Sequence, residues 1–259
     1  MVQIVRGIYS AATGMLAQQF VLDGLAGNLS NLSTTGFKQG VPTFQALREL
    51  AILRMGGPMD EAATPIGSLG MGAAFSHTEL DLTDGPLQRT DDPLDAALIG
   101  GGFFTVLTPF GERHTRAGHF ELQPAGRAPD GRQTAWLVDG AGNRVVGMRG
   151  PIRIADPRDV GIQPSGVVTS AGVEVDRLKV VDADAASITK LGGNLLLIDA
   201  PRPLANVVVR SGFLEQSNVN PVASMVKMIS VQRAYELAQR AVKSQDEALE
   251  RVVNEVPRR

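Results

Sequence analysis

Apolar side chains recur with helical spacing at both ends of the chain, where they form one long stripe each. In both stripes the steps alternate between four and three residues, with one break at Gln18 and one at Gln245. This alternation is typical of a coiled-coil seam. The N-terminal stripe is Ile4, Ile8, Ala11, Met15, Leu22, Leu25, Leu29 and Leu32. The C-terminal stripe is Met228, Val231, Tyr235, Ala238, Val242, Leu249, Val252 and Val256. The pattern predicts two long terminal helices that pair with each other as a coiled coil.

The inner ends of these helices carry their own signals. A run of Asn, Ser and Thr side chains, which compete for backbone hydrogen bonds, precedes Gly36, which tolerates a left-handed backbone. We therefore expect the first helix to run from about Val2 to about Asn31. Before the second helix, Asn220 can act as a cap and Pro221 can occupy the first helical position. That helix is expected to continue to about Val256.

The middle of the chain has a different pattern. Residues 39–75 look like a connector in which Phe44–Leu53 can form a short helix. From there to about Leu214, short β-type runs alternate with Gly, Asp and Asn turn signals. The predicted fold class is α+β, with long N- and C-terminal helices pairing as a coiled coil and a central mostly-β domain. The expected boundaries are 1–38 for the N-terminal helix and its following motif, 39–75 for the connector, 76–214 for the central domain and 215–259 for the C-terminal helix.

Composition narrows the possible functions. The chain has 259 residues, a net charge of −2 and no cysteine, which excludes disulfide frameworks and cysteine-based zinc sites and does not favour nucleic-acid binding. The N-terminal pattern does not resemble a cleaved secretory signal peptide. Polar residues interrupt the first apolar stripe, so we expect no membrane insertion. The stripe must therefore pack on protein.

No catalytic, cofactor or metal site is expected. The histidines form no zinc motif, and Ser187–Lys190 fits an S-x-x-K pattern without its partner motifs, so a loop is expected there. A group of aspartates lacks the spacing of a calcium-binding loop and is expected to be solvated. The histidines are His77, His114 and His119, and the aspartates are Asp81, Asp84, Asp91, Asp92 and Asp95. The chain is predicted not to be an enzyme.

Three groups of motifs, spread over nearly the whole chain, resemble bacterial flagellar rod and hook proteins. The N-terminal group is Ala11–Met15, Asn28–Asn31 and Ser33–Lys38. The central group is Pro93–Asp95, Gly100–Phe104 and Thr115–Phe120. The C-terminal group is Ser217–Asn220, Met228–Ile229 and Gln232–Glu236. The short central domain resembles the rod proteins more than the hook proteins, and Gly85–Asp95 resembles the proximal rod type slightly more than the distal one.

The resemblance implies a structural subunit of the flagellar basal-body rod that polymerises through its terminal helices into the tubular drive shaft. Its implied partners are further copies of itself, other rod and hook proteins, and the flagellar type III export apparatus. Its implied location is the rod that spans the periplasm, reached without a cleaved signal peptide. The expected assembly interface is Ile8, Met15, Leu22, Leu25, Leu29, Asn28, Asn31, Gly36, Phe37, Asn218, Asn220, Met228, Gln232, Arg233, Tyr235, Val242 and Leu249. The alternative is a soluble β-domain that binds carbohydrate or peptidoglycan and is dimerised by a closed coiled coil.

Overall fold

The chain divides into two compact units. A computed structural model describes residues 2–54, 64–127, 133–204 and 207–255. Unit 1 combines Met1–Leu29, Gly40–Glu79 and Pro221–Arg259, and unit 2 combines Ser30–Gln39 with Leu80–Asn220. Each unit therefore draws on segments that are far apart in the sequence.

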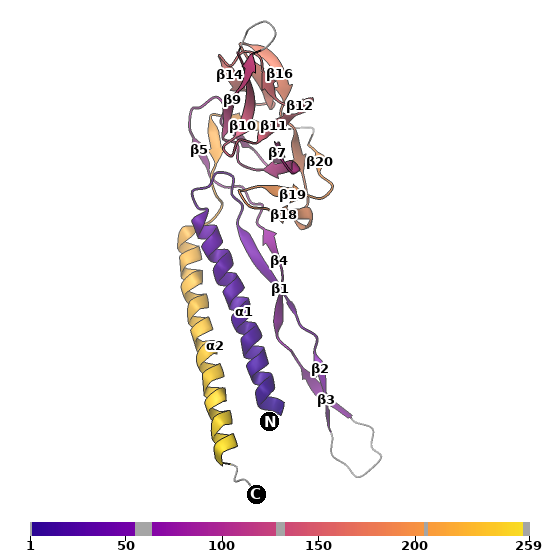
Figure 1. The fold of residues 1–259 in the computed structure, drawn as a ribbon, viewed down its shortest axis with the longest axis vertical. Helices are drawn as coiled ribbons and strands as arrows, with labels where there is room; N and C mark the ends of the chain where they lie inside the picture. Colours follow the sequence, from indigo (N-terminus) through magenta and orange to yellow (C-terminus); the bar gives the residue numbers. More distant parts are fainter. Residues whose placement is uncertain (1, 55–63, 128–132, 205–206, 256–259) are drawn as a thin grey trace. The chain divides into compact units, whose positions relative to one another are not determined.

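Unit 1 contains two long helices and a ribbon of strands (Figure 1). Helix α1 spans Val2–Ser30 and helix α2 spans Pro221–Glu255, which confirms the predicted helices and the place of Pro221 at the first helical position. In the ribbon, β1 (Gly40–Ala46) pairs with β4 (Ala73–Leu80), and β2 (Leu50–Arg54) pairs with β3 (Thr64–Leu69). The short helix predicted over Phe44–Leu53 is wrong, because this segment pairs as strands.

One face of α1 packs against this ribbon. The ring of Phe75 on β4 stacks on Phe20 of α1 with 4.7 Å between the ring centroids. Phe44 on β1 meets Phe75 edge-on at 6.3 Å. A methyl group added at Gly24 of α1 would lie 3.3 Å from a ring carbon of Pro42, so helix and strand approach closely there. The ribbon is thus a packing partner of α1 that the apolar stripe did not reveal.

The predicted long coiled coil is wrong, although the broader α+β description fits. Among the described stripe residues of α1, only Leu25 is buried, and Met15, Leu22 and Leu29 are half-buried. The described stripe residues of α2 are also half-buried rather than enclosed. The side chains of Ile4, Ile8, Leu249, Val252 and Val256 lie outside the described residues. The physical reason is that a heptad pattern shows which face of a helix prefers burial but does not specify the partner. Part of the surface of α1 packs on the β1–β4 ribbon.

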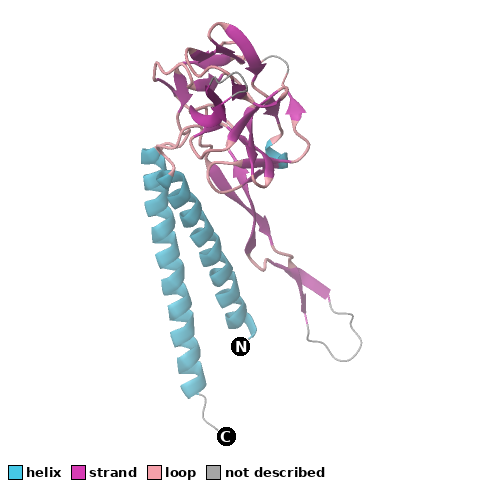
Figure 2. Cartoon of the chain, turned by 45° about the horizontal axis from the view of Figure 1, so that its top comes forward, coloured by secondary structure: helices cyan, strands magenta, loops and turns pink. Residues whose placement is uncertain are grey.

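Unit 2 is rich in strands, which are magenta in Figure 2. Its main sheet has the order β13-β10-β11-β7-β8-β19-β18, with β9, β12, β17 and β20 attached to it. A three-stranded sheet has the order β14-β15-β16, and β21 pairs with β6 and β22 with β5. The bounds are β5 (Leu87–Arg89), β6 (Ala96–Leu98), β7 (Phe103–Thr108), β8 (Gly111–Thr115), β9 (Phe120–Arg127), β10 (Gln133–Asp139), β11 (Arg144–Gly147), β12 (Gly150–Pro151), β13 (Arg153–Ile154), β14 (Val160–Ile162), β15 (Val167–Ser170), β16 (Val173–Arg177), β17 (Val180–Asp182), the 3₁₀ turn η1 (Ala185–Ser187), β18 (Ile188–Lys190), β19 (Leu196–Ile198), β20 (Arg202–Pro203), β21 (Val209–Ser211) and β22 (Phe213–Glu215).

The core of unit 2 lies between these sheets. Phe104 and Phe120 meet edge-on in it with 5.1 Å between their ring centroids, beside fully buried Leu137 and Ile154. The S-x-x-K segment, Ser187–Lys190, is the end of η1 followed by β18, so the predicted loop is wrong there. Across the described residues, no helix has both the length and the apolar character that a bilayer span requires.

Candidate functional site

The segment that follows α1 and the segment that precedes α2 lie side by side in unit 2. The N–H of Gly36 donates to the carbonyl oxygen of Glu215 at 2.7 Å, and the N–H of Asn218 donates to that of Phe37 at 3.4 Å. The N-terminal and C-terminal motifs of the chain therefore meet in one place, and Gly36, Phe37 and Asn218, which were expected at an interface between subunits, make contacts within the chain here.

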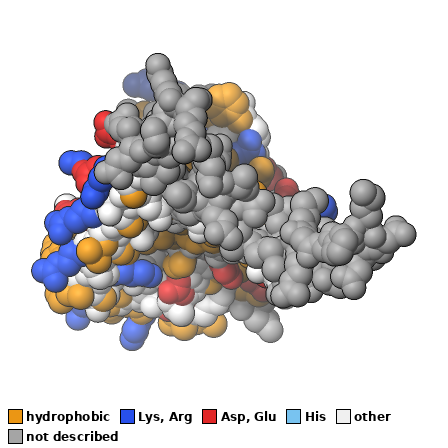
Figure 3. All heavy atoms as spheres, turned by 90° about the horizontal axis from the view of Figure 1, so that it is seen from below, with side chains coloured by type: hydrophobic (Ala, Val, Ile, Leu, Met, Phe, Trp, Pro, Cys, Tyr) orange, Lys and Arg blue, Asp and Glu red, His pale blue; other side chains and the backbone are white. Residues whose placement is uncertain are grey.

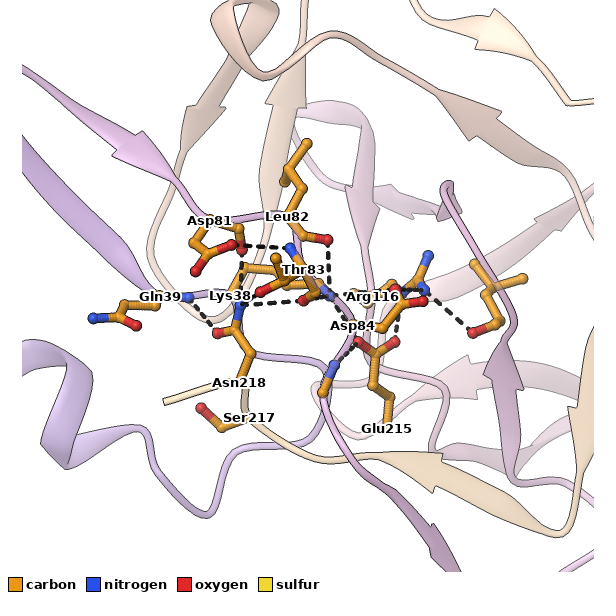
Figure 4. Close-up of polar contacts among 12 residues, drawn as sticks. Lys38, Gln39, Asp81, Leu82, Thr83, Asp84, Arg116, Glu215, Ser217 and Asn218 are labelled. Atoms are coloured by element: carbon orange, nitrogen blue, oxygen red, sulfur yellow. Dashed lines mark hydrogen bonds and ion pairs between the residues drawn. The ribbon is translucent and has the colours of Figure 1, made fainter. Parts of the chain in front are cut away.

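A buried carboxylate, Glu215, forms the centre of this junction (Figure 4). Its Oε1 accepts from Lys38 Nζ at 2.7 Å and from the Gly85 N–H at 2.9 Å, and its Oε2 accepts from Arg116 Nε at 2.5 Å. The side chains of Lys38, Arg116 and Glu215 are 4%, 2% and 2% exposed. The half-exposed carboxylate of Asp84 adds a second anion 3.0 Å from Arg116 Nη2. We name these four residues the junction cluster.

Both cations also donate hydrogen bonds to backbone carbonyl oxygens within the junction. Arg116 donates from Nη1 to the carbonyl oxygen of Gly102 at 2.5 Å and from Nη2 to that of Gly100 at 2.6 Å. Lys38 Nζ also donates to the carbonyl oxygen of Thr83 at 2.7 Å. Because a buried charge is tolerated only when it is paired and hydrogen-bonded, these backbone contacts are part of what keeps the cluster stable.

The environment of Glu215 keeps it ionised. Burial alone would raise the pKa of this carboxyl, but the charge of Arg116 and the hydrogen bonds from Lys38, Gly85 and Arg116 lower the pKa below its ordinary value. With its carboxylate held by both cations and closed to solvent, Glu215 is placed to fasten chain segments together rather than to exchange protons with a substrate.

Asn218 fastens a third segment to the junction. Its Oδ1 accepts from the N–H of Gln39 at 2.8 Å, and its Nδ2 donates to the carbonyl oxygens of Asp81 at 2.9 Å and Thr83 at 3.2 Å. One amide side chain, with both an acceptor oxygen and donor hydrogens, therefore satisfies backbone groups on both neighbouring segments.

The turn at Gly36 requires glycine for two reasons. Its φ of +64° is left-handed, as predicted, and a Cβ there would lie 2.4 Å from the backbone nitrogen of Ala117. The next residue, Phe37, is 2% exposed and has Lys190 Nζ 3.6 Å from its ring centroid. Asn194 Nδ2 donates to the carbonyl oxygen of Thr35 at 2.9 Å. The β18–β19 hairpin thus holds the turn in place.

Asn28 makes a comparable clasp inside unit 1. Its Nδ2 donates to the carbonyl oxygen of Gly40 at 2.8 Å, and its Oδ1 accepts from the N–H of the same residue at 3.0 Å. The side chain is 3% exposed, so it ties the last turn of α1 to the first residue of β1.

The remaining residues of the expected interface are not brought into the junction. On the helices, Met15, Leu22, Leu29, Met228, Tyr235 and Val242 are half-buried, whereas Gln232 and Arg233 are exposed. Asn31 is half-buried and accepts from Thr34 Oγ1 at 3.2 Å, and Asn220 is exposed. Ile8 and Leu249 have side chains outside the described set.

The sequence reasoning missed the charged members of the junction cluster. Lys38 and Arg116 lie in motifs named above but were given no role, and Glu215, a charged residue after the apolar pair Phe213 and Leu214, was not singled out. That isolated charge at the end of a β-type run was the one available signal, because its partner Lys38 is 177 positions away.

Comparison with known proteins gives the family. The family model described as "Flagellar basal body rod FlgEFG protein C-terminal" matches residues 210–255. The flagellar basal-body rod protein FlgF of Caulobacter vibrioides is 31% identical over 88% of this chain and 89% of its own length. This chain belongs to the flagellar basal-body rod proteins.

The rod protein is equally similar to relatives of the other rod type. FlgG of Borreliella burgdorferi is 30% identical over 95% of this chain and 97% of its own length. FlgG of Bacillus subtilis is 29% identical over 97% of this chain and 99% of its own length. The chain is therefore a structural subunit of the flagellar basal-body rod, and the segment matched by the family model contains Glu215, Asn218 and all of α2.

Proposed function

We propose that this rod subunit polymerises through its terminal helices and works mechanically, without catalysis or a cofactor. The observation that carries the proposal is an apolar face on α2 that unit 1 leaves uncovered. Val222, Val226 and Ile229 follow one another at helical spacing, with Leu237 about two turns further on, and they are 70%, 63%, 53% and 63% exposed. In Figure 3, apolar side chains lie on the described surface among basic and acidic ones.

Contiguous apolar surface of this kind usually marks a protein interface. Covering each Val or Ile side chain contributes roughly 1.5–3 kcal/mol. Repeated head-to-tail contacts that do not close produce a helical filament, which is the form a rod needs. Leu16 on α1, 55% exposed, offers a second apolar contact. We propose that the two helices are weakly ordered in the free subunit and become ordered as neighbouring subunits cover these faces.

The proposed contact differs in part from the expected interface. Exposed Gln232 lies beside the apolar face of α2, and exposed Arg233 lies within its row, between Ile229 and Leu237. Both are proposed to set the register between subunits, since exposed polar contacts contribute specificity more than affinity. The half-buried stripe residues, such as Met228 and Val242, are proposed to be covered more fully in the assembly.

A double variant, Val226→Asp with Ile229→Asp, tests this proposal. Light scattering over a concentration series should show polymer growth for the unchanged protein, and the critical concentration of the variant should be raised at least about tenfold. Hydrogen exchange should be fast in both helices of the free subunit and slow in the polymer. Phe110→Asp is the control, because Phe110 is 85% exposed but lies in the β7–β8 turn.

Unchanged growth of the double variant would refute the role of this face. A particle of fixed dimer mass, with both helices protected at low concentration, would instead support the carbohydrate-binding dimer.

We further propose that the subunit reaches the periplasmic rod through the flagellar type III export apparatus and keeps its N-terminus. Membership of the rod family supports this route. Mass spectrometry of the N-terminal peptide from isolated basal bodies tests it, since a peptide trimmed at a signal-peptidase site would contradict the proposal.

A further inference from the structure

We propose that the outer face of the main sheet in unit 2, centred on Trp136, binds an acidic segment of a neighbouring protein subunit. Trp136 on β10 lies directly opposite Arg153 on β13, and Val138, two residues further along β10, lies opposite Arg144 on β11. The guanidinium carbons of Arg144 and Arg153 lie 4.6 Å and 5.5 Å from the Trp136 ring centroid. We name these three residues the Arg–Trp–Arg face.

Strand alternation places this face on the side of the sheet away from the core. Leu137 and Ile154, the neighbours of Trp136 and Arg153, are fully buried in the core, whereas Arg144 and Arg153 are exposed and Trp136 is half-buried. A large aromatic ring therefore stands on an outer sheet surface, where no core packing requires it. The guanidinium groups of the two arginines lie over this ring.

Both guanidinium groups keep donors for an incoming acceptor. Stacking on a ring uses the flat face of a guanidinium and leaves its N–H groups directed outward. Arg153 donates from Nη2 to Thr134 Oγ1 at 3.1 Å. Within the described part of the chain, no carboxylate lies within ion-pair distance of Arg144 or Arg153. Glu121 on β9, which lies opposite Val138 on the same face, pairs with His119 Nε2 at 3.4 Å.

The chemistry of this face fits carboxylates presented by a protein. Arginine binds a carboxylate through two parallel hydrogen bonds, and the stacking holds each fork in position before binding, which lowers the entropic cost. Tryptophan and arginine are the residue types most enriched among those that dominate the energy of protein interfaces. An exposed strand surface suits a protein segment, and the chain is a subunit of a protein assembly. This inference does not depend on the proposed role of the terminal helices.

The test uses Trp136, which is the only tryptophan of the chain and so reports on its own surroundings. The probes are a peptide of alternating Glu and Ala and the same peptide with Gln in place of Glu. We expect a saturable change in Trp136 fluorescence with the Glu peptide, weakened by added salt, and no change with the Gln peptide. Arg144→Gln and Arg153→Gln should each weaken binding about tenfold.

Arg202→Gln is the matched control, because it removes the same charge from an exposed arginine on β20 that pairs with Asp184. Thermal unfolding of every variant should match the unchanged protein. Equal binding of the Gln peptide, or an equal loss in Arg202→Gln, would overturn specific recognition of carboxylates by this face. Equally tight binding of polygalacturonate, an acidic glycan, would overturn the assignment to a protein partner.

Discussion

Replacing Glu215 by Gln should destabilise unit 2 severely, because it removes the buried carboxylate of the junction cluster. The substitution keeps the volume but leaves Lys38 and Arg116, whose side chains are 4% and 2% exposed, without the carboxylate that they share. The remaining anion, Asp84, is 53% exposed and lies 3.0 Å from Arg116 Nη2 and 3.9 Å from Lys38 Nζ, so it replaces only part of the lost interaction. Removing one partner of a buried ion pair costs about 3–5 kcal/mol. This is a large fraction of the roughly 5–15 kcal/mol that stabilises a typical domain.

Lys38→Met should cost less, about 1–3 kcal/mol, since Glu215 keeps its bond to Arg116. The combination of Glu215→Gln with Lys38→Met should be more stable than the sum of the two losses predicts, because Lys38→Met removes a cation that Glu215→Gln had deprived of its closest anionic partner.

Urea unfolding followed by the fluorescence of Trp136, which lies in unit 2, measures these costs. A loss of about 4 kcal/mol corresponds to a midpoint lowered by roughly 2 M. Arg89→Gln is the control, because Arg89 pairs with Asp91 in a contact where the two side chains are 71% and 68% exposed, and it should cost less than about 0.5 kcal/mol. If Glu215→Gln cost no more than this control, the reasoning about buried charge would be wrong.

The same carboxylate gives a pH dependence. Because the native pKa of Glu215 is lowered, its stabilisation is present above the pKa of an unfolded Glu, about 4.3, and is lost as pH falls through the native value. The acid unfolding of Glu215→Gln should lack this component.

Three further measurements follow from the same structure. Gly36→Ala should destabilise the protein by about 2–4 kcal/mol, because the residue has a left-handed φ and its added Cβ would clash with backbone. Gly142→Ala is the control: its φ is +83°, no heavy atom lies within 4 Å of the added Cβ, and it should cost only about 1 kcal/mol. Equal costs in urea unfolding would show that the close packing around Gly36 is irrelevant. Burial lowers the pKa of Lys190 from 10.5 to about 8. Stability should therefore rise with pH between these values, because the amine loses its proton in the folded state at a lower pH than in the unfolded state. Competitive acetylation measures this pKa, and a value near 10.5 would contradict the burial argument. The hydrogen bond to Asp95 raises the pKa of His119, so the stabilisation that this pair provides is present below pH about 6.5 and is lost as pH rises through the native value. Titration by NMR should show that Asp95→Asn lowers this pKa, and an unchanged value would refute the pairing.

Local patterns in the sequence predicted the elements whose causes are local. Both long helices, the place of Pro221 and the left-handed turn at Gly36 follow from side-chain spacing and backbone preferences within a few residues. The motifs at Ser33–Lys38 and Ser217–Asn220 also indicated the correct family. The connector was the local failure, since the aromatic residue Phe44 fits a helix or a strand until Phe75 provides a strand partner.

The tertiary structure alone decided which surfaces meet. The seam predicted for the terminal helices, the bond from Lys38 to Glu215 and the stacking of Arg144 on Trp136 all concern partners from different segments. Apolar spacing shows that a face prefers burial, but several faces of the chain can satisfy that preference, and here the β1–β4 ribbon covers part of α1. A charged residue at the end of a β-type run likewise shows nothing of its counter-ion, because the pairing depends on how distant strands are registered. The sequence by itself determined the helices, the turns and the membership of the rod family, whereas the burial of the junction cluster arose only when the chain folded.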